Sequence, residues 1–264
     1  MRRPLTVLLT LFVTSCATLV EMPPISREVS AMDADSAWAA VLGRFVDDQG
    51  RVDFEGVRDR PDDLHVYVRY VSQTSPKRQP DRFALDRDRL AFYINSYNAL
   101  SMYNILDTGI PDTLAALRKI RFFFLKKLVV GGEALSLYKY ENEIIRKLGD
   151  ERIHFALNCM SAGCPRLPRK PFTAKGLDAE LNAEAHRFFG EERNVRVDAA
   201  ARKVYLSEIL KFYTEDFLRK SPNLIAYANR YRSADKKLPE DYEVEFIAYD
   251  WTVNIQPAPR IAKR

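Results

Sequence analysis

The chain has 264 residues, and 41 Lys and Arg side chains against 36 Asp and Glu give it a formal net charge of +5. Charge is therefore nearly balanced, and no basic block alternates with aromatic residues, which argues against a nucleic-acid-binding protein. Beyond the N-terminus, no apolar run reaches the roughly 20 residues that a transmembrane helix needs.

The N-terminus predicts a secretory signal followed by a lipid-attachment site. Residues 2–3 are arginines, and residues 5–13 form an apolar run too short to span a membrane. Residues 13–16 read Val-Thr-Ser-Cys and resemble the lipobox of bacterial lipoproteins, in which the cysteine is acylated and becomes the mature N-terminus. The alternative is an ordinary signal peptide in which Cys16 is incidental.

The lipobox interpretation divides the chain into four parts. We expect residues 1–15 to be the signal peptide, 16–33 the lipidated N-terminus and tether, 34–254 one folded domain, and 255–264 a basic tail. The membrane would be a partner through the acyl chains on Cys16. Ala17, in place of an aspartate, favours release to the outer membrane on its periplasmic side.

The first half of the domain predicts mainly helices. Apolar residues recur at helical spacing over 35–47, 62–73 and 86–107. Residues 122–130 then predict a strand, which Gly131-Gly132 turns into a second strand. Ser136 follows as the cap of a helix that ends at Gly149.

The second half mixes short strands and helices. Residues 152–158 predict a strand on which His154 and Asn158 share one face. A helix from Thr173 to Gly190, a hairpin of 195–197 with 204–206, helices over 207–219 and 222–232, and a strand over 244–248 follow. Without regular βαβ spacing, this order predicts a single α+β domain whose short, largely antiparallel sheet is packed with helices.

The densest group of reactive side chains lies at residues 154–165, which read His-Phe-Ala-Leu-Asn-Cys-Met-Ser-Ala-Gly-Cys-Pro. Thiol catalysis needs a cysteine of lowered pKa, a base and a polar group that orients the base. We assign Cys164 as nucleophile, with Cys159 second, His154 as base, and Asn158 or Asn98 as the orienting amide.

Structural alternatives exist for the same residues. The two cysteines can be bridged in an oxidising envelope or be small buried residues, and His154 can make a structural hydrogen bond. A zinc site would need a fourth ligand that the spacing does not offer, so neither a metal nor another cofactor is predicted.

Three of the predicted helices carry polar side chains of interest. Asn95 and Asn98 share a helical face and are expected to pin nearby loop backbone, unless Asn98 lines a pocket with His154. Glu141 and Arg146 predict an ordinary surface ion pair. Glu215 and Asp216 predict an exposed helix face.

Several of these segments, in this order, resemble one known family, the domain of unknown function 547 (DUF547). They are the Tyr-Ile-Asn-Ser-Tyr-Asn-Ala of 93–99, the Gly131-Gly132 turn with residues 135–137, Glu141 with Arg146, residues 152–165, 205–207, 212–213 and 215–217, and the Tyr-Asp-Trp of 249–251. The resemblance runs from about residue 50 to 254 and implies a single α+β domain, often secreted or lipid-anchored, with no established reaction.

The resemblance also implies a set of site residues. The matching positions are Asn95, Tyr97, Asn98, Glu141, Arg146, His154, Asn158, Cys159, Cys164 and Pro165. The chain departs from the pattern at Asn142, where a histidine is common, and at Arg166, where a second proline is common.

Two functional hypotheses follow. The first is a thiol-dependent hydrolase or acyl transferase acting on an envelope peptide or amide, with Asn95, Tyr97, Glu141 and Arg146 lining its pocket. It predicts a free thiol within hydrogen-bond reach of His154 and facing an open cleft. The second is a non-catalytic envelope protein that binds a peptide or protein partner or scaffolds an assembly, with a buried or bridged cysteine pair and no cleft.

Overall fold

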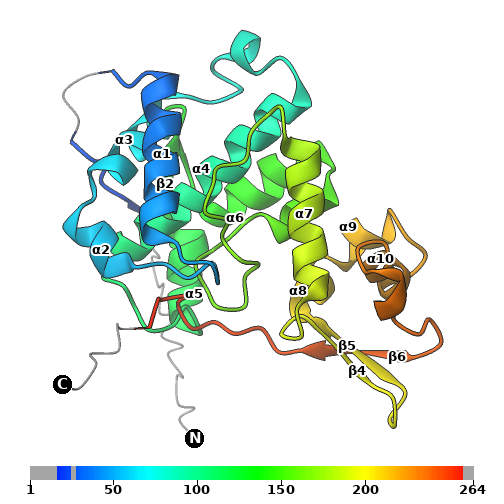
Figure 1. Cartoon of the computed structure of the whole chain (residues 1–264). Helices are drawn as coiled ribbons and strands as arrows, with labels where there is room; N and C mark the ends of the chain where they lie inside the picture. Colours follow the sequence, from blue (N-terminus) through cyan, green and yellow to red (C-terminus); the bar gives the residue numbers. More distant parts are fainter. Residues whose placement is uncertain (1–16, 25–27, 258–264) are drawn as a thin grey trace, which may run out of the picture.

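A computed structural model describes residues 17–24 and 28–257 of the chain (Figure 1). The first half contains β1 (Thr18–Leu19), α1 (Ala31–Phe45), α2 (Phe54–Asp59), α3 (Asp62–Gln73), η1 (Pro80–Phe83), α4 (Asp86–Asp107), α5 (Leu117–Ile120), η2 (Arg121–Leu125), β2 (Lys126–Val130) and β3 (Glu133–Leu135). The second half contains α6 (Leu137–Lys139), η3 (Tyr140–Ile145), η4 (Arg146–Leu148), η5 (Glu151–Phe155), α7 (Leu177–Gly190), β4 (Val195–Asp198), β5 (Lys203–Ser207), α8 (Glu208–Phe212), α9 (Thr214–Leu218), α10 (Leu224–Asn229), η6 (Ala234–Lys236) and β6 (Glu243–Ile247).

Three long helices organise the N-terminal half, and the sequence predicts all three, although α1 begins at Ala31 rather than at residue 35 and ends at Phe45. The side chain of Ser30 caps α1 by accepting a hydrogen bond from the Asp33 amide at 3.1 Å. The helix then buries Trp38 and Phe45 against its neighbours. The 22-residue α4 is buried along most of its length, which places its polar residues inside the protein.

The hydrophobic interior forms two clusters, and the 3₁₀ helix η5 lies between them. The larger cluster joins α1, α3 and α4, and the smaller one joins α7 to α10 with β4, β5 and β6. Ile153 belongs to the larger cluster and Phe155 to the smaller one. The segment that carries His154 is therefore fixed from both sides.

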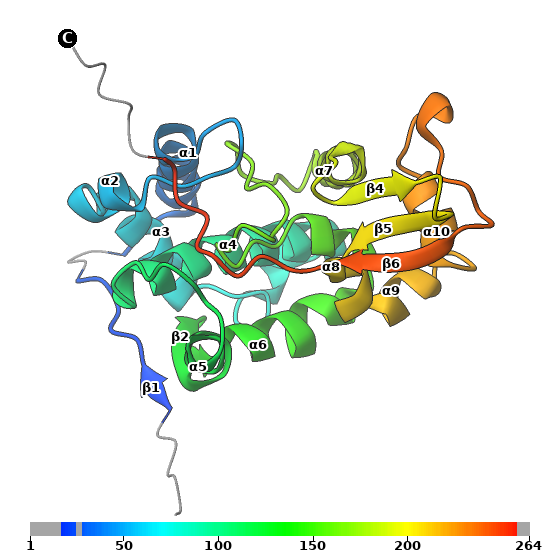
Figure 2. The same cartoon turned by 90° about the horizontal axis from the view of Figure 1, so that it is seen from below.

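The strands form two small three-stranded sheets, each of mixed direction. In the first sheet, β1 pairs with β2 in parallel and β2 pairs with β3 antiparallel through the turn at Gly131-Gly132. In the second, β4 and β5 form the predicted hairpin, and β6 adds to β5 in parallel. Figure 2 shows this second sheet at the end of the molecule that also carries α10. The α+β class is confirmed, whereas the largely antiparallel sheet is wrong.

The predicted strand over 152–158 is also wrong. Residues 151–155 form the 3₁₀ helix η5, whose start is capped by the Asp150 side chain on the Arg152 amide. Ile153, His154 and Phe155 are consequently all buried, so the strand alternation assigned to His154 does not exist. A short segment that is buried on both faces carries apolar residues without a helical or strand spacing. The sequence therefore cannot distinguish a helix from a strand here.

Other differences concern boundaries. Residues 121–125 continue α5 as the π-helical η2, so the strand predicted over 122–130 begins only at Lys126. The region 207–219 is divided into α8 and α9. The helix predicted over 222–232 is the six-residue α10, which starts at Leu224 and is capped by the side chain of Asn223.

In the part of the chain that the structure describes, no helix is both long and apolar enough to cross a membrane. The predicted signal peptide and Cys16 lie outside the described residues.

Candidate functional site

An open cavity of about 410 Å³ lies where the two hydrophobic clusters meet. Both cysteines and His154 line it, together with a wall of aromatic side chains from several elements. The lining residues used below are Tyr97, Lys119, Phe123, Phe124, Tyr138, Glu141, Asn142, Arg146, His154, Cys159, Cys164, Phe212, Tyr213, Tyr249 and Trp251. The cleft that the catalytic hypothesis requires is therefore present.

The segment that leads into the cysteine loop is held by hydrogen bonds from Asn98 of α4. The Asn98 side-chain amide donates to the Ala156 carbonyl at 3.0 Å, and its oxygen accepts the Asn158 amide at 2.7 Å. Both backbone groups are buried and need these partners. The expectation that Asn98 pins loop backbone is confirmed, and both ends of its amide are committed.

The side chain of Asn158 likewise hydrogen-bonds to backbone groups within the loop. Its side-chain nitrogen donates to the Pro165 carbonyl at 2.7 Å, and its oxygen accepts the Met160 amide at 2.7 Å. Met160 adopts a positive φ of 71°, which turns the chain sharply between the two cysteines. Neither Asn98 nor Asn158 hydrogen-bonds to His154, so the structure does not give them the orienting role.

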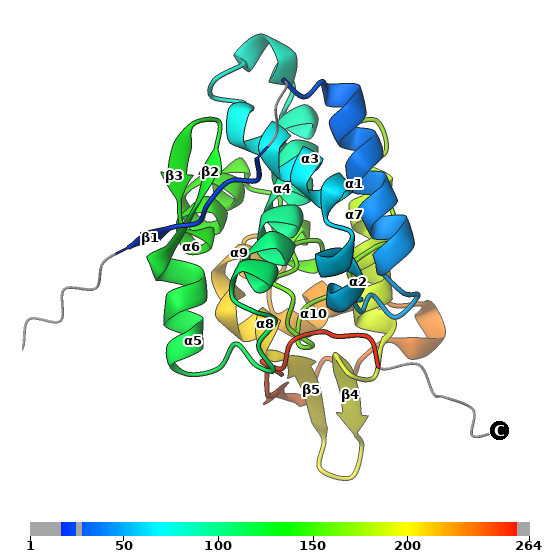
Figure 3. The same cartoon turned by 90° about the vertical axis from the view of Figure 1, so that its left-hand side faces the viewer.

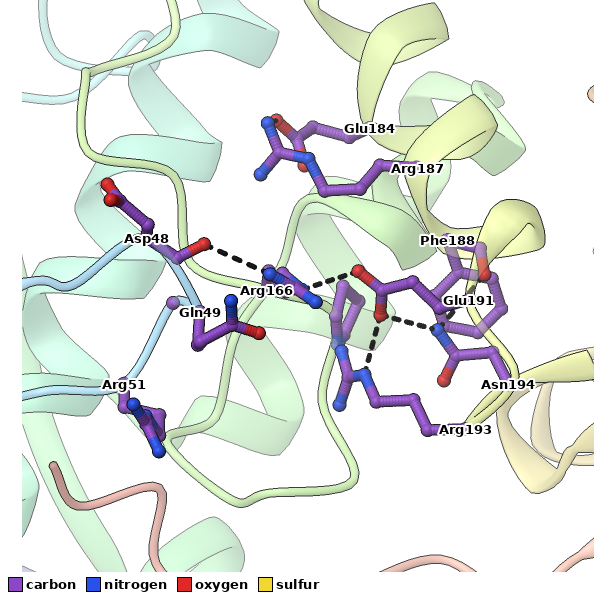
Figure 4. Close-up of polar contacts among 12 residues, drawn as sticks. Asp48, Gln49, Arg51, Arg166, Glu184, Arg187, Phe188, Glu191, Arg193 and Asn194 are labelled. Atoms are coloured by element: carbon purple, nitrogen blue, oxygen red, sulfur yellow. Dashed lines mark hydrogen bonds and ion pairs between the residues drawn. The ribbon is translucent and has the colours of Figure 1, made fainter. Parts of the chain in front are cut away.

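A network of charged residues supports the outer side of the same loop. Figure 4 shows Arg166 and Arg193 both paired with Glu191, which in turn contacts Asn194. Arg193 also donates to the carbonyls of Ala162 at 2.8 Å and Cys164 at 3.1 Å. The loop is thus fixed on both faces before any ligand binds.

The two thiols are free and lie side by side. Their sulfur atoms are 3.0 Å apart, and both residues are buried except where they line the cavity. The Cys164 sulfur also accepts the backbone N–H of Cys159 at 3.1 Å and lies 3.0 Å from the Tyr249 hydroxyl. Ser161 completes the cluster, with its hydroxyl 3.0 Å from the Cys159 sulfur.

These contacts shift the pKa values of the two thiols in opposite directions. Burial raises the pKa of the Cys164 thiol, but hydrogen bonds from Cys159, Ser161 and Tyr249 outweigh it and bring that pKa down to about 6. The pKa of Cys159 is raised well above its usual value by its hydrogen bond to Cys164 and by burial. Of the two thiols, Cys164 is therefore the one whose ionised form the surroundings favour.

His154 is paired with a carboxylate that sequence reasoning missed. Its Nε2 lies 2.8 Å from Asp216 Oδ2, and the ring of Tyr213 stacks on the imidazole at 3.7 Å. Burial lowers the pKa of His154, while the hydrogen bond to Asp216 raises it in part. Arg146 also donates to Asp216, at 2.9 Å, and the two donors hold the pKa of that carboxyl below its usual range.

The prediction that Asp216 lies on an exposed helix face is wrong for this reason. The α9 helix has only five residues, too few for apolar periodicity to show which side faces inward. The neighbouring Phe217 is fully buried, and this apolar neighbour is the one sequence signal that places the turn against the core.

The expected surface ion pair of Glu141 with Arg146 is also wrong. Glu141 is buried and accepts hydrogen bonds from the hydroxyls of Tyr97, at 2.8 Å, and Tyr213. Arg146 binds Asp216 and, at 2.6 Å, the side chain of Asn142. Asn142, which stands where the family often has a histidine, therefore contributes to the same charged network.

The structure brings most, but not all, of the predicted site residues together. Tyr97, Glu141 and Arg146 line the cavity as predicted, whereas Asn95 does not and instead binds the backbone of Phe172 at 2.7 Å. The prediction of a thiol hydrogen-bonded to His154 is wrong, because no hydrogen bond joins His154 to either sulfur within the described residues, although all three line one cavity. Tyr213, Asp216 and Tyr249 are the additional members.

Among residues 17–24 and 28–257, no group of three or more His, Cys, Asp or Glu side chains could hold a metal ion.

We predict that replacing Asn98 destabilises the fold at the site loop. Asn98→Ala leaves the buried Ala156 carbonyl and Asn158 amide without partners, which costs roughly 3 kcal/mol of unfolding free energy. Asn142→Ala removes a partly exposed amide and should cost less than about 1 kcal/mol. Urea denaturation measures both, and equal losses would show that Asn98 does not hold the loop.

The model of one known family matches the middle of the chain. No curated protein and no solved structure matches it. The model of one family, described as "Protein of unknown function, DUF547", matches residues 81–189. This stretch includes both cysteines and His154 but not Tyr213, Asp216 or Tyr249. Residues 81–189 thus carry a DUF547 domain.

Proposed function

We propose that this chain is a thiol-dependent hydrolase or acyl transferase that acts on a peptide or amide of the cell envelope. The observation that carries the proposal is the environment of the Cys164 sulfur. It faces an open cavity, accepts a backbone N–H and lies beside the Tyr249 hydroxyl, so that it is ionised near neutral pH.

The chemistry follows from the groups that line the cavity. The Cys164 thiolate attacks the substrate carbonyl, a thioester bond forms, and the carbon–nitrogen bond breaks. His154 takes up the proton that the Cys164 thiol gives up, is stabilised in its charged form by Asp216, and passes this proton to the leaving amine. Neutral His154 then takes a proton from water or from an acceptor amine, which attacks the thioester and releases Cys164.

Asp216 replaces the amides as the group that orients the imidazole in this mechanism. A carboxylate beside the ring both fixes its position and stabilises its charged form. Arg146 donates to this carboxylate and also to the side-chain oxygen of Asn142, so the network reaches from η3 to α9.

A non-catalytic envelope protein with a structural cysteine pair is the second candidate. The observation in its favour is the 3.0 Å separation of two largely buried sulfurs, which an oxidising compartment could bridge. The open cavity and the His154–Asp216 pair favour the catalytic proposal, because a structural bridge needs neither.

The catalytic proposal predicts an acyl-enzyme on Cys164. Incubation of the reduced protein with a library of peptide thioesters and amides should add an acyl mass to Cys164, detected by intact mass and peptide mapping. Cys164→Ala should form no adduct. Asp216→Asn should slow turnover about 10²- to 10⁴-fold, the usual range for general acid–base catalysis.

Glu215→Gln is the matched control for Asp216→Asn, because Glu215 is an exposed carboxylate on the same helix. It should leave turnover unchanged. Absence of any adduct on a thiol that still reacts with iodoacetamide would count against the mechanism and favour the binding protein.

We also propose that Cys16 carries a lipid anchor and that the protein faces the periplasm from the outer membrane. The lipobox-like residues 13–16 and Ala17 support this proposal. Within the described residues, the first strand, β1, begins at Thr18, which is two residues after Cys16 in the sequence.

Labelling cells with palmitate tests the anchor. The wild-type chain and the Cys164→Ala control should incorporate label, and Cys16→Ala should not, because the acyl acceptor is lost. Label that persists in Cys16→Ala would overturn the proposal.

A further inference from the structure

We propose that the exposed face of α5 and η2 rests on an anionic membrane surface and turns the mouth of the cavity toward the lipid. We call Leu117, Ile120 and Phe124 the apolar stripe. The inference rests on the proposed lipid anchor at Cys16, and it adds an orientation and a source of substrate to the proposed function.

The apolar stripe is exposed although its residues are large and hydrophobic. Leu117, Ile120 and Phe124 are 81%, 49% and 41% exposed. Their spacing of three and four residues places them on one side of the continuous helical segment 117–125. Tyr138, itself 45% exposed, stacks on Phe124 at 4.5 Å and widens the apolar surface. Such contiguous exposure marks an interaction surface.

Basic residues flank the stripe. The eleven residues 117–127 contain five Lys or Arg and no acidic residue, in a chain whose overall charge is nearly balanced. Arg118 and Arg121 are exposed beside the stripe, whereas Lys126 is buried against Asp107 and is already neutralised. An apolar face with a basic border is typical of segments that lie in the interface of an anionic membrane.

The position of the anchor selects the membrane as the occupant. Thr18 pairs with Lys126 at the start of β2, directly after η2 (Figure 3). Cys16 precedes Thr18 by two residues, a reach of at most about 7 Å. An acyl chain on Cys16 would therefore hold this face near the lipid headgroups. A second copy of the chain fits less well, because two basic borders would repel each other.

The cavity opens beside the same surface. Phe123, Phe124 and Tyr138 line it, and Lys119 lies 4.0 Å from the centre of the Trp251 ring at its wall. A substrate entering past these side chains would come from the membrane surface. The geometry thus favours an amphiphilic peptide or amide held at the bilayer over a freely diffusing one.

Hydrogen exchange of the full, lipid-anchored protein tests the orientation. We would compare vesicles containing phosphatidylglycerol with vesicles of phosphatidylcholine alone. Amides of residues 117–125 should exchange roughly 30-fold more slowly on the anionic vesicles, the factor expected for two exposed basic residues near the surface. Leu117→Glu with Ile120→Glu, or Arg118→Gln with Arg121→Gln, should remove the difference.

Val197→Glu with Leu218→Glu is the matched control, because both side chains are exposed hydrophobics on other elements. It should keep the protection. Equal exchange of 117–125 on both vesicles, with palmitate still on Cys16, would overturn the orientation and leave the anchor intact. Protection that appears in solution with rising protein concentration would assign the stripe to a second copy instead. Loss of palmitate labelling would identify failure of the anchor itself.

Discussion

The hydrogen bonds from Asn98 to the backbone of residues 156–158 are the constraint on which the site depends. They fix the segment between the two hydrophobic clusters, where backbone groups have no access to water and no sheet to satisfy them. From that fixed point the chain turns through Met160 and returns at Cys164, so that one sulfur meets the backbone N–H of Cys159. The hydrogen bonds that lower the pKa of the Cys164 thiol come from Cys159 and Ser161 in this loop and from the Tyr249 hydroxyl, rather than from a neighbouring cation.

Two halves of the site come from parts of the chain that are far apart. The thiols and His154 lie on one continuous segment, whereas Tyr213, Asp216 and Tyr249 arrive from the C-terminal region beyond the match to the DUF547 family. The family match therefore covers the nucleophile and the base but not the groups that tune them. Catalysis as proposed requires the C-terminal elements to be folded onto the α4 side of the molecule.

The sequence predicts an element well where its apolar residues repeat at a regular spacing over several turns. The helices at 62–73 and 86–107 are predicted at their observed boundaries, because each repeats its apolar positions over three turns or more. The segment 152–158 is not, since its apolar residues face two clusters at once. The sequence predicts the cysteines, His154 and Glu141 as site residues from the chemistry of their side chains. It does not predict Asp216 as the partner of His154. Asp216 lies on one short turn and is 62 residues away, and only the packing of Phe217 brings it inward.

The most direct test of this account is the ultraviolet absorbance of the thiolate as a function of pH in the reduced protein. The account predicts a step with its midpoint near the Cys164 pKa of about 6, absent in Cys164→Ala and shifted upward in Tyr249→Phe, which loses a hydrogen-bond donor to the sulfur. A step that appears only near the ordinary cysteine value of roughly 8.5, or that survives in Cys164→Ala, would contradict the assignment of Cys164 as the nucleophile.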